Sequence, residues 1–178
     1  MKSIGKCLCS LVVVAGLVTA TPSGSAAQEI YQSPRDFLSE MFDDNIPLMR
    51  TLVVTAEIRD EAARILRHGY GAERVNYWSE GARTIWILEE IGRYRPITVG
   101  LAVSNGEIET LRVLIFRESH GWEVRHAFFT DQFKGLGLDA DNDLTANIDG
   151  ISGATLSVNA LRSLARLALY FDGHVQGE

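Results

Sequence analysis

The residue with the clearest chemical potential is Thr155, which follows Asp149-Gly150-Ile151-Ser152-Gly153-Ala154 and opens a long helical pattern. We expect Ser152 to cap this helix through its hydroxyl, with Gly153, Ala154 and Thr155 in the first turn. The Thr155 hydroxyl would then lie where free backbone N–H groups and the positive end of the helix dipole converge. A phosphate esterified to this oxygen would occupy an anion site, and the small Gly153 and Ala154 leave room for it.

The stretch Asp149 to Thr155 resembles the flavinylation motif of the FMN-binding domain family. This domain occurs in the C subunit of the sodium-translocating NADH:quinone oxidoreductase, in the G subunit of the Rnf complex and in many small extracytoplasmic proteins. In the family, an FAD:protein FMN transferase joins FMN to the last Thr or Ser of the motif through a phosphoester bond. The resemblance therefore implies covalent FMN on Thr155, with Asp149 and Ser152 to Ala154 shaping the site for the transferase and the phosphate.

A second segment carries the same resemblance. Glu118-Ser119-His120-Gly121-Trp122-Glu123 resembles the family's Glu–small–small–Gly turn, and an aromatic–Gln–Phe segment with Gln132 and Gly135 follows it. The resemblance extends from Pro96 to Phe171. It implies that Glu118, Ser119, Gly121 and Trp122 border the isoalloxazine ring, and that Trp122 stacks on one face of it. The spacing of Phe128, Phe129 and Phe133 instead predicts one buried helix face.

The N-terminus is typical of a secretory signal peptide. Lys2 and Lys6 precede an apolar run from Leu8 to Ala20, and Ser25-Ala26-Ala27 provides small residues for cleavage after Ala27. The run is too short to span a membrane. We therefore expect an exported, periplasmic or extracytoplasmic protein.

Cleavage at this site would change the chemistry that the chain can perform. Cys7 and Cys9 would both be lost, which excludes disulfides and thiolate sites from the mature protein. Loss of the two lysines takes the formal charge from −6 to −8. Such an acidic balance argues against a nucleic-acid partner, which selects clustered Lys and Arg.

The rest of the chain predicts an α+β domain. Ser33-Pro34 opens a helix that should run to about Asp44, and Thr55 caps a second helix that Gly69 should end. From Val75 the pattern is that of strands, and Asn105-Gly106 between two β-rich runs is a strong hairpin signal. We expect a small antiparallel sheet of about four strands with a central hairpin, N-terminal helices and a C-terminal helix packed on the sheet.

Three segments follow from this pattern. Residues 1–27 are the expected signal peptide, 28–95 an N-terminal helical extension with the first strands, and 96–178 the FMN-binding domain.

Other catalytic and metal-binding patterns do not fit. His120 and His126 lack carboxylates at a diagnostic spacing, so no metal site is predicted. The acidic stretch that begins at Asp139 has Leu144 where a calcium loop needs Gly. Ser152 is not in a nucleophile elbow, because Ala154 stands where that motif requires Gly. No catalytic residue is assigned.

The favoured function is therefore an exported electron carrier that relays electrons to or from a membrane redox partner after maturation by an FAD:protein FMN transferase. Its flavin would supply the redox chemistry. Two alternatives stay open: a flavin-dependent reductase of a small acceptor, and a non-redox binding or sensing module of the same fold.

Overall fold

The computed structural model describes residues 28–176. The predicted signal peptide, with Cys7 and Cys9, lies outside the described residues. The strands form one antiparallel sheet in the order β1-β6-β5-β4-β3-β2. They are β1 (Glu29–Ile30), β2 (Arg50–Val53), β3 (Arg74–Glu80), β4 (Arg83–Ile91), β5 (Pro96–Ser104) and β6 (Glu107–Phe116). The α-helices are α1 (Pro34–Met41), α2 (Ala56–Leu66), α3 (Ala127–Thr130) and α4 (Thr155–Val175), and two 3₁₀ turns are Trp122–Arg125 and Asp131–Phe133.

The predicted fold class is confirmed, including the central hairpin and the C-terminal helix on the sheet. Asn105 and Gly106 connect β5 to β6, and both have positive φ (53° and 77°), as a two-residue type I′ turn requires. The expected count of about four strands was too low. The sheet also contains β1 and β2, which are short and lie at its two edges. Neither is long enough to show a clear alternation of buried and exposed residues.

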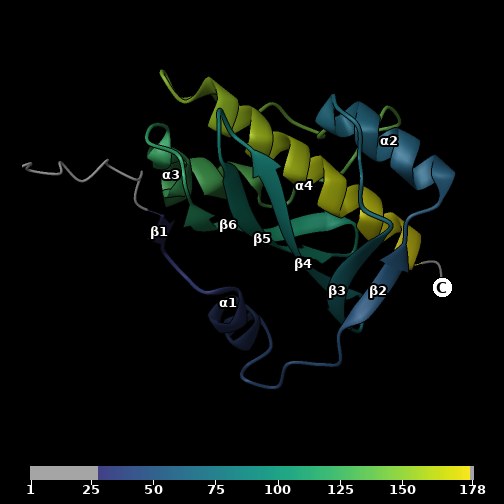
Figure 1. Ribbon diagram of the computed structural model, residues 1–178. Coiled ribbons are helices and arrows are strands. Elements are labelled where there is room, and N and C mark those ends of the chain that lie inside the picture. The colour runs from purple at the N-terminus through teal and green to yellow at the C-terminus, as the bar shows by residue number, and fades with distance from the viewer. Residues whose placement is uncertain (1–27, 177–178) are drawn as a thin grey trace, which may run out of the picture.

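Helices cover both faces of the sheet (Figure 1). The long α4 lies across one face beside α2, and α1 lies against the opposite face. The α4 face holds the larger core, in which the buried rings of Trp86 and Phe171 are 5.6 Å apart. The α1 face holds a smaller core around Phe37, which is fully buried.

The starts of α1 and α2 were predicted well and their ends were not. Ser33 Oγ and Thr55 Oγ1 accept hydrogen bonds from backbone N–H groups in the first turns of α1 and α2, as expected. However, α1 ends at Met41, because Asp43 and Asp44 take positive φ. Helix α2 ends at Leu66, where Arg67 rather than a glycine adopts the left-handed conformation.

A buried polar chain fixes α4 on the sheet. Trp86 Nε1 donates to Thr84 Oγ1 (2.9 Å), and Thr84 Oγ1 donates to Asp172 Oδ1 (2.6 Å). Asp172 is 1% exposed, so this carboxylate depends on its partners for the hydrogen bonds that water would otherwise supply. These contacts hold the C-terminal half of α4 and leave its N-terminal half to form the site.

Candidate functional site

Helix α4 begins two residues later than the sequence predicted. Thr155 is the first helical residue, Ala154 is the N-cap, and no side chain caps the helix, so the prediction of Ser152 as N-cap is wrong. Gly153 has φ +83°, and Ala154 N–H donates to Ile151 O (3.0 Å) in a tight turn that the helix cannot include.

Because of this turn, Thr155 is the first residue of α4, and its side chain is exposed. The first helical hydrogen bond runs from Val158 N–H to Ala154 O, so the N–H groups of the three residues before Val158 lie outside the helical ladder. Ser152 and Gly153 are exposed and Ala154 is buried.

The Gly121 turn packs directly against this helix start. Gly121 is buried with φ +84°, and a methyl group at its Cα would lie 2.7 Å from Ser157 Oγ and 3.3 Å from Ala154 Cβ. The structure thus brings together the two segments that carried the family resemblance. Only glycine satisfies both the backbone conformation and the close approach.

Glu118 reaches away from the helix start and holds the turn between β4 and β5. Its Oε1 accepts hydrogen bonds from the backbone N–H groups of Arg93 (2.5 Å), Tyr94 (2.5 Å) and Arg95 (2.8 Å). Burial by itself raises the pKa of this carboxyl. The three backbone donors and the Arg93 guanidinium outweigh that effect and hold the pKa below its usual value. Glu118 is therefore an ionised anchor for a backbone turn.

Gln132 connects the aromatic segment to the motif. Its Oε1 accepts a hydrogen bond from Asp149 N–H (2.7 Å), which fixes the loop ahead of Thr155. Phe129 and Phe133 are fully buried as predicted, with ring centroids 5.6 Å apart. The prediction that Phe128 is buried is wrong. It is 65% exposed, because the segment folds as the short helix α3 between two 3₁₀ turns and not as one longer helix.

Trp122 is 44% exposed and belongs to a cluster with Arg125, Tyr31 and His126. The Arg125 guanidinium lies 4.3 Å from the Tyr31 ring and 5.2 Å from the Trp122 ring, and His126 contacts Trp122 edge-on. Ser119 is exposed nearby, with Oγ 2.9 Å from His120 Nδ1. Neither Trp122 nor Ser119 lines the groove described next.

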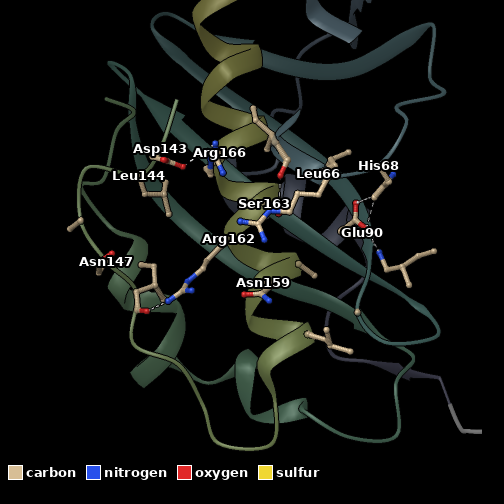
Figure 2. Close-up of a pocket in the computed structure, with 18 of the residues that line it drawn as sticks. Leu66, His68, Glu90, Asp143, Leu144, Asn147, Asn159, Arg162, Ser163 and Arg166 are labelled. Atoms are coloured by element: carbon tan, nitrogen blue, oxygen red, sulfur yellow. Dashed lines mark hydrogen bonds and ion pairs between the residues drawn. The ribbon is translucent and has the colours of Figure 1, made fainter. Parts of the chain in front are cut away.

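A groove of about 840 Å³ runs along α4 from the residue after Thr155. Figure 2 shows Asn159 and Arg162 projecting from α4 into it, with Asp143 and Leu144 on one side and His68 and Glu90 on the other. Four elements form it: the end of α2, the end of β4 with Gly92, the loop 139–148, and one face of α4. Apolar lining comes from Ile65, Leu66, Ile91, Leu144, Ile148 and Leu156.

Thr155 points along the same helix face as the groove's polar residues. Asn159, Arg162 and Arg166 follow Thr155 at intervals of four, three and four residues, which places all four on one stripe of α4. At about 1.5 Å per residue the stripe is roughly 16 Å long. Ser157, which meets Gly121, lies on the other side of the helix. An extended ligand attached to Thr155 would have the groove along this face of α4.

The arginines of this stripe also fix the far wall of the groove. Arg162 Nη2 donates to Ile148 O, and Arg166 donates through Nε to Asn142 O (2.6 Å) and pairs with Asp143 (3.0 Å). Both residues come from α4 and bind the loop 139–148, which leads into the motif. The loop thus keeps its place because charge-assisted hydrogen bonds satisfy its carbonyl groups.

Residues 92–170 match the family model described as the FMN-binding domain. This segment of the chain is similar to the FMN-binding domain family. The matched segment starts at the turn held by Glu118 and ends within α4, so it includes the Gly121 turn, Gln132 and the motif. The recognition from sequence is confirmed, and the match supports FMN as the ligand of this domain. No curated protein matches the chain.

The residues that line the groove suit FMN. Sites for ligands of this size occupy about 300–1,000 Å³ and combine apolar walls with a few polar groups, which agrees with this groove. Leu66, Leu144 and Leu156 offer apolar contact to a flat ring, and Asn159 and Arg162 offer donors to its carbonyl oxygens or to ribityl hydroxyls. Among residues 28–176, no group of three or more His, Cys, Asp or Glu side chains is arranged to hold a metal ion.

Sequence reasoning missed several groove residues. Asn159, Arg162 and Arg166 could have been found from their helical spacing to Thr155. His68 and Glu90 carry no such signal, because α2 and β4 meet only in the folded chain. The boundary at residues 95 and 96 stays a prediction, although the elements before it contribute four of the six strands.

Proposed function

We propose that the protein is an exported electron carrier with FMN esterified to Thr155 Oγ1. The observation that carries the proposal is the groove that begins beside an exposed threonine at the first position of α4, within a matched FMN-binding domain. The ester would form when an FAD:protein FMN transferase joins the FMN phosphorus to Thr155 Oγ1. The phosphoanhydride bond of FAD breaks in this step, AMP leaves, and the hydroxyl proton goes to a base.

Each part of the site would have a separate task. Gly153 and Ala154 give the transferase access to the hydroxyl, and the free N–H groups of the first turn bind the ester phosphate. Gln132 and Gly121 hold the motif loop and the helix start in place. Leu66, Leu144 and Leu156 exclude water from the ring, and Arg162 supplies positive charge beside it.

The attached FMN supplies the redox chemistry. An ester bond keeps the cofactor at high local concentration even when the groove opens, which suits a compartment where free FMN would be diluted. Among residues 28–176, no helix has both the length and the apolar character of a membrane span. A membrane redox partner would therefore meet this part of the chain at its surface.

Anaerobic visible spectroscopy tests the role as a carrier. The flavinylated protein should keep its oxidised spectrum when mixed with NADH or NADPH alone, and should bleach when membranes from the native host are added with an electron donor. Rapid bleaching by a soluble nicotinamide alone would establish the reductase instead. A colourless protein, after co-production with the transferase, would favour the binding or sensing module.

A further inference from the structure

One wall of the groove comes from residues that precede the matched domain. Ile65 to His68, at the end of α2, and Glu90 and Ile91, at the end of β4, line the groove but lie before residue 92. The N-terminal half of this chain therefore contributes to a site whose other walls belong to the FMN-binding domain. Two contacts hold the end of α2: Ser163 Oγ of α4 donates to Ile65 O (3.4 Å), and His68 binds Glu90.

The hydrogen bonds of His68 require a doubly protonated ring. Nε2 lies 3.1 Å from both carboxylate oxygens of Glu90, and Nδ1 lies 3.1 Å from Gly69 O. Both partners are acceptors, so only the imidazolium can donate from both nitrogens. The Gly69 carbonyl and the Glu90 carboxylate raise the pKa of His68 above 6.5, although partial burial opposes them.

Ile65 anchors the end of α2 in the core, whereas Arg67, His68 and Gly69, which follow the helix, are exposed. Arg67 ends the helix in the left-handed conformation (φ 63°), which a residue with a side chain adopts at an energetic cost. Glu90 is largely covered, with 11% of its side chain exposed, whereas the His68 side chain is 53% exposed. His68 thus joins a helix end held in a costly conformation to a well-packed strand.

Other charged side chains also face the groove. They are Arg67 beside His68, Arg162 and Arg166 on α4, and Asp139 and Asp143 in the loop. Arg166 is paired with Asp143, and Arg162 is bound to a carbonyl group. Histidine is the side-chain type whose ordinary pKa lies between pH 5 and 8, and His68 is the one histidine of the described residues that lines the groove.

We propose that His68 and Glu90 are a pH-dependent positioning pair that holds the end of α2 over the flavin. The proposal rests on the proposed function, because it assumes that the isoalloxazine ring lies in this groove. When His68 is protonated, the ion pair and the Gly69 hydrogen bond keep the wall in place. When it loses its proton, one acceptor loses its donor, the wall loosens, and solvent and soluble oxidants reach the ring.

The sign of the pH effect follows from the raised pKa. The contribution of the pair is complete below the ordinary histidine value of 6.5 and is lost as the pH rises through the higher value in the folded protein. A partly exposed pair changes an opening equilibrium by about two- to fivefold. Access to the flavin should therefore increase by roughly this factor across the titration.

Two readouts test the pair separately from the cofactor. In the protein without FMN, amide hydrogen exchange at residues 65–69, corrected for its intrinsic pH dependence, should become faster as His68 titrates in the NMR spectrum. In the flavinylated protein, iodide quenching of flavin fluorescence should increase over the same pH range. His68→Arg should keep both readouts low and independent of pH, because its charge persists, and His68→Gln should keep both high. His174→Gln, at the far end of α4, should behave as wild type.

Each outcome decides a different claim. If amide hydrogen exchange at residues 65–69 does not change as His68 titrates, His68 and Glu90 do not act as a positioning pair. If amide exchange follows the His68 titration but iodide quenching of the flavin does not, the pair holds the end of α2 but does not control access to the flavin. If co-production with the transferase yields no flavin at all, the proposed function fails and the proposal fails with it, while the exchange data still report on the pair itself.

Discussion

Replacing Gly121 by Ala should lower the free energy of unfolding by about 2–4 kcal/mol, because the new methyl group meets a positive φ and a close neighbour at once. That methyl group would lie 2.7 Å from Ser157 Oγ, next to the start of α4. The start of α4 must then move relative to the Gly121 turn. Attachment of FMN to Thr155 should therefore fall as well. Urea denaturation and flavin absorbance per polypeptide measure the two effects.

Gly135 provides a matched control for this substitution. Its φ is +74°, close to that of Gly121, but no atom lies within 4 Å of a methyl group built there. Gly135→Ala should therefore show the backbone cost alone, about 1–2 kcal/mol. Adding Ser157→Ala to Gly121→Ala should recover part of the loss, because it removes the closest atom. Equal destabilisation by Gly121→Ala and Gly135→Ala would show that the contact with α4 is unimportant.

Glu118→Gln should destabilise the protein at neutral pH by about 1–3 kcal/mol, because three backbone donors exchange a charged acceptor for a neutral one. The wild-type carboxyl has a lowered pKa in the folded state. Its contribution is therefore complete above the ordinary value of 4.5 and is lost as the pH falls through the lower folded value. The difference between the two proteins should shrink on acidification.

Thermal unfolding of both proteins between pH 3 and 7 measures this effect. Glu107→Gln, on an exposed residue at the start of β6, serves as the control and should follow wild type across the range. A difference for Glu118→Gln that stays constant with pH would mean that the ionised carboxylate does not hold the turn at residues 93–95.

Short-range signals in the sequence predicted much of the fold. The Ser33 and Thr55 caps, the Asn105-Gly106 turn and the long C-terminal helix each depend on neighbours within a few residues, and the structure contains all of them. The family resemblance rested on local motifs in the same way. Packing between distant segments did not enter these predictions.

The errors arise where the local sequence pattern does not determine the backbone conformation or the contacts that form. Ser152 has the right chemistry for an N-cap, but Gly153 adopts a positive φ and the helix starts at Thr155. Phe128 has helical spacing to other aromatic residues, yet the segment folds as the short helix α3 between two 3₁₀ turns and exposes it. The place of Glu118 at the ring stays a prediction, but its contact with a turn more than twenty residues earlier in the chain was not foreseen.

The groove itself was beyond sequence reasoning for the same reason. Its walls come from α2, β4, the loop 139–148 and α4, which span about a hundred residues of chain. Of these walls, only the α4 stripe, from Thr155 to Arg166, follows a helical spacing that is visible in the sequence. The partnership of His68 with Glu90 depends on where the end of α2 meets β4, which no spacing in the sequence encodes.

Intact-mass spectrometry of the purified protein, co-produced with an FAD:protein FMN transferase, tests the central claim most directly. We expect wild type and Thr155→Ser to gain the mass of one esterified FMN, because both present a hydroxyl at the first position of α4. Thr155→Ala should gain none, although its fold is unchanged by circular dichroism. A wild type without added mass, or an alanine variant that still carries FMN, would contradict the assignment of Thr155.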